Sequence, residues 1–568
     1  MSRLRIRRRV VDLVEGVGAL DAYFSARRRM RRWRSALGAE VGRRRFVELV
    51  GPLPDGYTVA HTGRRWHVAA TERSVRLHDL RQDNFETLTA ALVAGGIEYF
   101  VVATGSHERT AVGVPASRRA ETLRALRAAE TAPNWCVTTS RDGSIVPVAL
   151  VDDARWSADV ADAAVLDTYH VVTDAGAVRV VGRALRCELQ FWTSTEEEEE
   201  GGGPSRLPGP FLRPPTGNPF VEEIPASRIR QDSITVAGRD HPIAPEFRWY
   251  LDGAECPFPI DVVYTWVDGD DPAWRERRDE AASVSSRVTV DGGADERFRT
   301  FDELRYSLRS VWQYVPHVRH VYVVTDRQRP SWLDGDHPML SIVDHRDVFD
   351  DPSVLPTFNS HAIETQLHHV EGLCEHYLYL NDDVFFGRLS DWSTYFDRSG
   401  RSRFFPSRAR FRFGDPGTDD PSVDNAGKNL QRELVRETGW APWRKIKHTP
   451  HPQQRSLMYE IEGRFPDAYR TTRGARFRST TDVSLAVALH HRYGEAVGRT
   501  SVGTIAYQYL NLADHNLPDR LDRLLVSDDD TFCLNDGAMT GDHEAIRREV
   551  LAFLDARFPF VAPWETDR

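Results

Sequence analysis

The chain lacks the features that define several large classes of protein. It has only five cysteines in 568 residues, and no two of them form a Cys-x-x-Cys pair. We therefore expect reduced thiols in a cytoplasmic protein and no structural zinc site of that type. No apolar run approaches the roughly 20 residues that a membrane-spanning helix needs. The N-terminus also lacks the apolar core and cleavage site of a signal peptide.

Motifs that would assign a function directly are missing as well. The sequence contains no phosphate-binding P-loop, no Gly-x-Ser-x-Gly nucleophile motif, and no dinucleotide-binding glycine motif in its proper context. These absences argue against a nucleoside triphosphatase, a serine hydrolase or a dinucleotide-dependent oxidoreductase, because the motifs that usually identify those classes are missing. The composition, 40% hydrophobic and 28% charged, is that of a soluble globular protein.

Lysine is scarce, and the positive charge is unevenly placed. Lysine occurs only at positions 428, 445 and 447, so arginine supplies nearly all cations. Residues 1–45 hold 14 arginines and four acidic residues, a net charge of +10, whereas the whole chain carries −10. Apolar residues between Val10 and Phe24 recur at helical spacing among these arginines. This pattern predicts a basic amphipathic helix.

We expect the basic arm to contact an anionic membrane surface, which would make the protein peripheral on the inner face of the cell membrane. The alternative is a solvated helix that packs its apolar stripe on the rest of the protein. A nucleic-acid partner is not expected, because nothing downstream supports one. The sequence indicates no oligomeric state.

Composition and periodicity divide the chain into five segments. The basic helical arm is residues 1–50, and an accessory α/β module follows at residues 51–195. Residues 196–258, rich in glutamate, glycine and proline, predict a linker and irregular connection. Residues 259–540 form the main domain, and residues 541–568 predict a C-terminal helix that packs on it.

The main domain alternates predicted strands and helices. Apolar, β-branched runs at 260–267, 318–325, 340–343 and Tyr377–Leu380 indicate strands, and helical periodicity lies between them. This order predicts an α/β fold, a mostly parallel sheet with helices on both faces. In such sheets ligands bind beyond the carboxyl ends of the strands.

The most informative stretch is HYLYLNDDVFFG at His376–Gly387. Its predicted strand ends in Asn381, Asp382 and Asp383. Two adjacent carboxylates at a strand end are well placed for a divalent cation, Mg²⁺ or Mn²⁺, which prefers oxygen ligands and often bridges to phosphate. The alternative is a surface turn whose aspartates cap the next element.

Other polar residues fall at predicted strand ends and helix starts. Carboxylates together with arginines suit a phosphorylated substrate, because phosphoryl transfer needs positioning, charge neutralisation and a base. Histidine suits the base, since its ordinary pKa lies near neutrality. The pair His448-x-x-His451 spans a proline, so we do not expect a helical zinc site there. The remaining candidates are Asp268, Asp536, Arg305, Arg476 and Arg478.

Four blocks together resemble the Stealth protein family. The blocks are IDVVYTWVDG at Ile260–Gly269, a long block from Phe301 to YLNDDVFFG, a third within Lys447–Gly494, and FCLND at Phe532–Asp536. The family includes bacterial capsule polymerases that transfer hexose-1-phosphate, and the N-acetylglucosamine-1-phosphotransferase that tags lysosomal enzymes. The resemblance spans about residues 259–537 and makes the main domain a catalytic domain with a nucleotide-sugar transferase-like fold.

The resemblance implies a reaction and a set of substrates. The donor would be a nucleotide sugar, usually UDP-linked, and the acceptor a glycan hydroxyl in capsular or cell-surface polysaccharide synthesis. The hydroxyl would attack the sugar-linked phosphorus, UMP would leave, and the product would carry a phosphodiester. Two alternatives stay open: a metal-dependent glycosyltransferase that releases UDP, and a non-catalytic carbohydrate-binding scaffold.

Matched position by position, the resemblance and our role assignments give three sets of site residues. The catalytic set is Asp261, Asp382, Asp383, His448 and Arg478. The donor-binding set is Thr265, Trp266, Val267, Asp268, Arg305, Asn359 and Ser360. The metal set is Asp382 and Asp383, with Asp536 as a further candidate. Arg478 is followed by Ser479, where animal members have histidine, so acceptor preference is not transferred.

Overall fold

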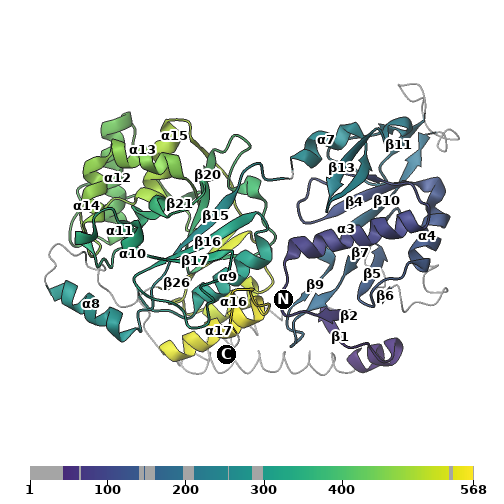
Figure 1. The fold of residues 1–568 in the computed structure, drawn as a ribbon, viewed down its shortest axis with the longest axis horizontal. Helices are drawn as coiled ribbons and strands as arrows, with labels where there is room; N and C mark the ends of the chain where they lie inside the picture. The colour runs from purple at the N-terminus through teal and green to yellow at the C-terminus, as the bar shows by residue number, and fades with distance from the viewer. Residues whose placement is uncertain are drawn as a thin grey trace, which may run out of the picture.

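A computed structural model describes residues 42–62, 65–139, 146–147, 160, 162–195, 210–253, 255–283, 289, 298–536 and 542–566. An N-terminal module and a C-terminal α/β domain lie side by side in it (Figure 1). The predicted basic arm falls outside these residues except for a helical stretch at 42–50. None of the described helices combines the length and the hydropathy that crossing a membrane requires.

A five-stranded sheet forms the centre of the α/β domain. Its order is β17 (Leu340–Asp344), β16 (Val318–Thr325), β15 (Ile260–Thr265), β18 (His376–Asn381) and β23 (His451–Gln454). Neighbours among the first four strands pair in parallel, and β23 is antiparallel to β18. The carboxyl ends of the parallel strands therefore share one edge.

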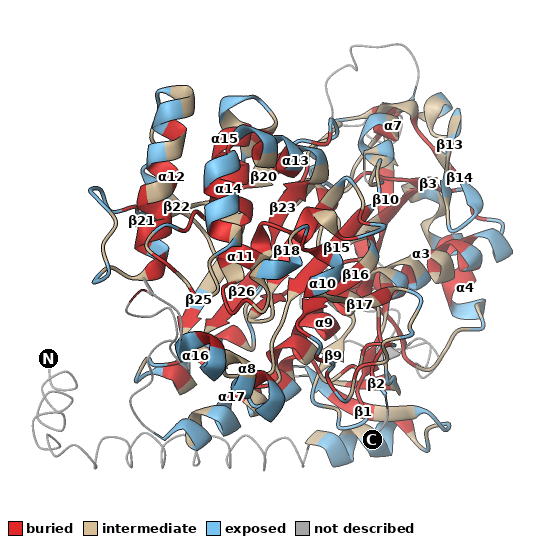
Figure 2. Ribbon diagram, turned by 60° about the vertical axis from the view of Figure 1, so that its left-hand side comes forward, coloured by how far each residue is buried: buried red, intermediate tan, exposed pale blue. Residues whose placement is uncertain are grey.

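Both faces of this sheet are covered, which explains the continuous apolar runs of its strands. Side chains alternate along β15: Val262 and Tyr264 join one hydrophobic core, and Val263 joins the other. Figure 2 shows buried central strands with helices around them that expose one face. The predicted α/β fold with a mostly parallel sheet is confirmed.

Helices of the domain fall on the two sides of the sheet. The first core includes residues of α9 (Glu303–Tyr314), α16 (Leu517–Leu524) and α17 (His543–Arg557). The second includes residues of α10, α12, α13, α14 and α15, which are His345–Val348, Ser422–Thr438, Arg455–Arg464, Pro466–Arg473 and His490–Ala496. The remaining two helices are α8 (Pro272–Ser283) and α11 (Ser360–Glu364).

A small three-stranded sheet continues directly from the end of β18. Its order is β19 (Val384–Phe386), β26 (Thr531–Asn535) and β25 (Tyr507–Asn511). Val384 is paired with Cys533, so the FCLND block lies against the strand that follows Asp383. Two further pairs complete the domain: β20 (Ser402–Phe404) with β24 (Thr500–Val502), and β21 (Pro406–Arg410) with β22 (Arg444–Ile446).

The N-terminal module contains two sheets and the helices α3 (Leu77–Ala94), α4 (Arg119–Ala128) and α7 (Pro245–Asp252). One sheet has the order β1 (Tyr57–Thr62), β2 (Arg65–Thr71), β8 (Val172–Thr173) and β9 (Val180–Val181). The larger sheet joins β13, β14, β3, β4, β10, β7, β5 and β6 in that order, at residues 232–236, 239–243, 100–101, 110–115, 187–194, 165–170, 135–139 and 146–147.

The structure has paired β-strands in part of residues 196–258, where a linker and irregular connection were expected. Residues 196–209 lie outside the described chain, but β11 (Phe211–Arg213) pairs with β10 and with β12 (Ile224–Pro225). Further along, β14 pairs with β3, and its hairpin with β13 turns at Ala237 and Gly238, both at positive φ. Pro210 and Pro214 flank β11 rather than interrupt it, and Pro225 lies in β12, an edge strand, where a missing backbone amide is tolerated.

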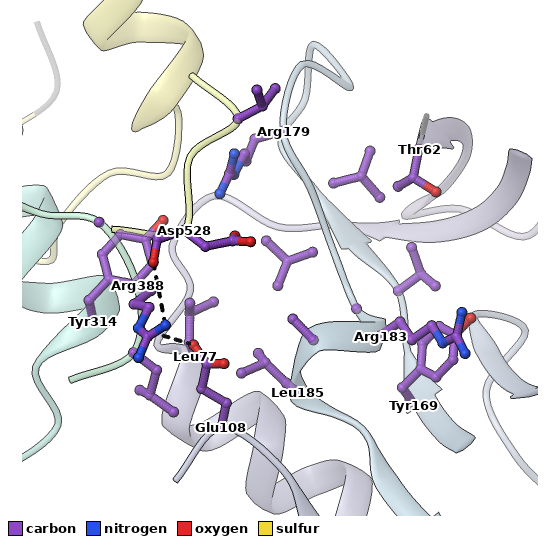
Figure 3. A pocket seen from close by; sticks show the side chains of 18 of the residues that line it. Thr62, Leu77, Glu108, Tyr169, Arg179, Arg183, Leu185, Tyr314, Arg388 and Asp528 are labelled. Carbon is purple, nitrogen blue, oxygen red and sulfur yellow. Dashed lines mark hydrogen bonds and ion pairs between the residues drawn. The ribbon is translucent and has the colours of Figure 1, made fainter. Parts of the chain in front are cut away.

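The two parts of the chain share a hydrophobic core. Leu77, Leu80 and Leu185 of the module pack in the same cluster as the residues of α9 and α17. A cavity of about 860 Å³ remains between the parts, with Arg179 and Arg183 on the module side and Arg388 and Asp528 on the domain side (Figure 3). None of the predicted site residues lines it.

The C-terminal segment is tied to α9 by a buried ion pair. Glu565 accepts hydrogen bonds from Arg309 at 2.7 and 2.8 Å and from Arg305 at 2.7 Å. The side chains of Glu565 and Arg309 are 2% and 7% exposed. Removing one partner of such a pair leaves the other charge buried and unpaired.

Glu565→Ala should therefore lower the free energy of unfolding by about 3–5 kcal/mol. Chemical denaturation followed by circular dichroism measures the change. Glu371, which is exposed, supplies the control, and Glu371→Ala should change stability by no more than about 0.5 kcal/mol. Equal stability of the two variants would show that the ion pair does not hold the C-terminal segment.

Candidate functional site

Asp383 is held from three sides in the turn between β18 and β19. Its backbone carbonyl accepts a hydrogen bond from the Leu534 amide at 3.0 Å. One carboxylate oxygen lies 3.2 Å from Nε2 of His448, and the other accepts from the Cys533 thiol at 3.2 Å. The pairing of β19 with β26 therefore fixes the position of this carboxylate, and the segment before β23 supplies His448.

The Asp383–His448 contact raises the pKa of the histidine. Burial alone would lower the pKa of His448, but the nearby Asp383 carboxylate outweighs it, and the net shift is upward from the ordinary value. His448 therefore keeps its proton to a higher pH than a free histidine. A protonated imidazole paired with a carboxylate can donate to a phosphate oxygen.

Glu303, in the first turn of α9, adds a third carboxylate to Asp382 and Asp383. Its side chain is buried and accepts hydrogen bonds from the Phe301 amide at 2.5 Å and the Thr300 hydroxyl at 3.2 Å. Burial raises the pKa of Glu303 to about 7. Burial, then Glu303 and Asp383, raise the pKa of Asp382 well above its usual range.

The three carboxylates concentrate negative charge that a divalent cation would neutralise. Neither Glu303 nor Asp382 forms an ion pair with an arginine or lysine within the described ranges, so their mutual repulsion is not offset there. Carboxylate oxygens are the ligands that Mg²⁺ and Mn²⁺ prefer. Asp383, His448 and Cys533 form a second donor group, whose nitrogen and sulfur suit a softer metal. The third predicted ligand, Asp536, is ion-paired with Arg299 at 2.8 Å.

Arg478 lies at the start of α11, beside the residues that the sequence predicted for donor binding. Its guanidinium donates to the Ser360 hydroxyl at 2.6 Å and to the Ser422 hydroxyl at 3.2 Å. Asn359 caps α11 by accepting from the His361 amide, and its own amide donates to Asp482 at 2.9 Å. Asn359 is therefore the N-cap of α11.

A buried polar chain connects the arginine with the strand ends. Glu364 accepts from the Tyr379 hydroxyl at 3.4 Å, and that hydroxyl also lies 2.9 Å from Asn381 and 3.2 Å from Thr265. Burial raises the pKa of Glu364 to about 7, although Arg478, Tyr379 and His448 oppose the rise. Tyr379, Arg478 and His448 therefore lie around one buried carboxylate.

The other donor-binding candidates extend β15 at the same edge. The Trp266 amide donates to Val324 of the neighbouring strand at 3.0 Å, and Val267 packs against the cluster of Trp274 and Phe298. The Asp268 amide donates to the Gln328 side chain at 3.0 Å, which holds the turn after the strand.

Two predicted site residues are not brought to this edge. Asp261 lies at the amino end of β15, about 13 Å from the strand's other end, where its buried carboxylate is paired with Arg319 at 2.7 Å. Arg305 points to the C-terminal segment and pairs with Glu565. Both residues sit in well-matched blocks, but strand direction and helix face place them elsewhere.

Glu303, Glu364 and Cys533 were missed by sequence reasoning. Glu303 and Glu364 read as ordinary helix residues, and Cys533 as a buried thiol. The available signals were weak: Glu303 opens a helix that follows a predicted strand, and Cys533 lies inside the FCLND block.

The whole chain was compared with known proteins. Conserved regions 1 to 4 of the Stealth proteins match residues 258–283, 297–404, 447–495 and 522–568. Exopolysaccharide phosphotransferase SCO6023 of Streptomyces coelicolor is 37% identical over 522 residues, which are 89% of this chain and 86% of that protein. The chain belongs to the Stealth family. The family assignment made from the four sequence blocks is confirmed.

Other relatives of this Stealth protein give similar coverage. Exopolysaccharide phosphotransferase CpsY of Mycobacterium leprae is 34% identical over 524 residues, 88% of this chain and 90% of the relative. Among solved structures, the galactosyltransferase LgtC, crystallised with donor and acceptor sugar analogues, covers 53% of this chain and 96% of its own at 11% identity. Its TM-score is 0.29, too low to support a conclusion about the fold.

Asp383→Asn should lower the pKa of His448, because burial would then act with less opposition from a carboxylate. Histidine-selective NMR across a pH series measures this pKa in the intact protein. The loss of positive charge on His448 should move to lower pH.

Asp344→Asn is the matched control, because Asp344 also ends a strand and caps the next helix, a role that asparagine keeps. An unchanged His448 titration in Asp383→Asn would contradict the assigned pairing.

Proposed function

We propose that the protein transfers a sugar 1-phosphate from a nucleotide sugar, UDP-linked, to a hydroxyl of a glycan acceptor, in capsular or cell-surface polysaccharide synthesis. The observation that carries this proposal is the Asp383–His448 pair, set beside Glu303 and Asp382 at the carboxyl edge of the parallel sheet. The relatives' names, exopolysaccharide phosphotransferase, support the same reaction class.

The proposed chemistry is a single displacement at phosphorus. The acceptor oxygen forms a bond to the sugar-linked phosphorus, and the phosphoanhydride bond to UMP breaks. UMP leaves with the bonding electron pair, and the acceptor proton passes to a base. Positioning and charge neutralisation supply most of the acceleration in such reactions.

Each side chain has a distinct role in this proposal. Glu303, with a pKa of about 7, is suited to take the acceptor proton at neutral pH. His448, whose pKa the Asp383 carboxylate raises, would donate to the phosphate that is being transferred when its ring is protonated. A divalent cation held by Asp382 and Asp383 would supply positive charge for the diphosphate.

Arg478 would bind the diphosphate. The hydroxyls of Ser360 and Ser422 hold its guanidinium in place, and a planar guanidinium can bind two phosphate oxygens at once. Thr265 to Asp268 extend from the same edge and would line the nucleotide.

A donor labelled at its sugar-linked phosphorus distinguishes this reaction from the alternatives. With UDP-sugars carrying ³²P in the β position, Mg²⁺ or Mn²⁺ and a glycan acceptor, we expect label in the glycan and unlabelled UMP. Transfer of the sugar alone would leave the label in UDP and would refute the proposal. A scaffold protein would give neither product.

Asp383→Asn should reduce turnover about 100-fold or more, because the charged partner of His448 is lost. Asp344→Asn is again the control and should stay near the wild-type rate. The ³²P assay measures both, and circular dichroism checks that both variants are folded. Full activity of Asp383→Asn would remove Asp383 from the site.

Arg478→Lys should raise the KM for the donor about tenfold or more, because lysine cannot keep the two hydroxyl contacts and bind phosphate in a planar, two-point manner. Arg470→Lys is the control, since Arg470 is exposed and forms only a surface ion pair with Asp467 among the described contacts. An unchanged donor KM in Arg478→Lys would place the diphosphate elsewhere.

A further inference from the structure

A second group of potential metal ligands lies where the segment that begins at Asn359 meets α13. His368 and His369 are adjacent in a short 3₁₀ turn, η7 (Leu367–His369), and Glu462 is on α13. Nε2 of His368 and Nε2 of His369 lie 3.0 and 3.1 Å from the same oxygen of Glu462. All three atoms fall within 4.8 Å of one another, as metal ligands do.

The group is anchored in the core and open to solvent on one side. The His368 side chain is fully buried, whereas those of His369 and Glu462 are 17% and 28% exposed. The ring of Tyr459 packs on both imidazoles, at 4.6 and 5.5 Å between centroids. The rings are therefore held in place, and an ion can reach them from outside.

The hydrogen bond at Nδ1 of His369 determines which ring nitrogen of this histidine carries the proton. Nδ1 of His369 is 3.1 Å from the carbonyl oxygen of Val348, which can only accept, so Nδ1 carries the hydrogen. A neutral ring then presents a lone pair at Nε2, directly toward the Glu462 carboxylate. Either a second proton or a bound cation relieves this repulsion.

The amide nitrogen of Gln366 lies 3.3 Å from Nδ1 of His369 but does not change that assignment. With its nitrogen toward Asp350 and Val348, it donates to an oxygen of each at 3.1 Å, while its own oxygen accepts from Tyr469. Both amide hydrogens are thus used on oxygen atoms. Nδ1 of His369 still has the Val348 carbonyl as its acceptor.

The three side chains are of the types that bind zinc. Two imidazole nitrogens and one carboxylate are a known zinc donor set. The Nδ1–H contact of His369 to a backbone carbonyl is typical of a metal-bound histidine.

We propose that His368, His369 and Glu462 bind a Zn²⁺ ion at a structural site separate from the candidate catalytic site. The ion would tie together two segments that carry site residues. One begins with Asn359 and Ser360 and ends at His369, and the other runs from His448 through β23 into α13. The site does not depend on which reaction the protein catalyses.

Metal binding to the chelator-stripped, full-length protein tests the proposal. Titration with Zn²⁺ should show one more tightly bound equivalent in the wild type than in Glu462→Gln, and that equivalent should raise the Tm. Glu460→Gln is the matched control, because Glu460 lies on the same helix but accepts from Tyr493. It should bind as many equivalents as the wild type.

A second variant covers the case in which Glu462→Gln does not fold. In His369→Arg, a guanidinium can keep the ion pair with Glu462 but cannot ligate zinc, so the protein should stay folded and lose the equivalent. Co²⁺ reports the ligands: this site should give visible bands without a thiolate charge-transfer band. A thiolate band that disappears in Cys533→Ser would instead report Co²⁺ bound at the group of Asp383, His448 and Cys533.

Two results would overturn the proposal. One is equal zinc stoichiometry in the wild type, Glu462→Gln and His369→Arg. The other is that the Cys533→Ser protein binds no stoichiometric zinc. His368, His369 and Glu462 would then form only an imidazolium–carboxylate ion pair.

Discussion

Three carboxylates share one edge of the parallel sheet, and the structure around them depends on holding this charge in place. Glu303 arrives on α9, and Asp382 and Asp383 arrive at the end of β18. Burial and mutual repulsion raise the pKa of Glu303 and of Asp382, so the edge is costly without a proton or a cation. The small sheet and His448 fix the third carboxylate. Under the proposed function, this concentration of negative charge suits a substrate that arrives with a cation bound to its phosphates.

The framework of this edge could be predicted from the sequence, because strand runs and their polar ends are local patterns. Tyr377–Leu380 and Val262–Tyr264 are apolar on both faces, which is typical of buried parallel strands. Asn359 follows the ordinary preference for helix caps. Asp383, His448 and Arg478 were predicted as site residues because they lie in blocks that resemble one family. Each of these signals can be recognised from a few consecutive residues.

The remainder depends on tertiary contacts, which local patterns do not encode. Cys533 reaches Asp383 only because β26 pairs with β19, and 150 residues separate the two side chains in the chain. Glu364 becomes a site residue only because Tyr379 and Arg478 enclose it. Conversely, Asp261 belongs to a matched block but is a strand length from the edge, and its partner Arg319 makes it part of the scaffold. Residues 210–253 show the same limit, since their pairing with β3 and β10 is long-range.

The candidate site is divided between segments that are far apart in sequence, so its geometry depends on how firmly those segments are joined. Ser360 and Glu364 come from the segment before β18, and His448 from the segment before β23. Arg455 at the start of α13 donates to the backbone carbonyls of His368 and Leu373, and Glu462 at its far end holds His368 and His369. The two segments are thus joined at both ends of α13. Precise alignment of Arg478 with His448 requires this, because misplacement of about 1 Å can cost roughly 100-fold in rate.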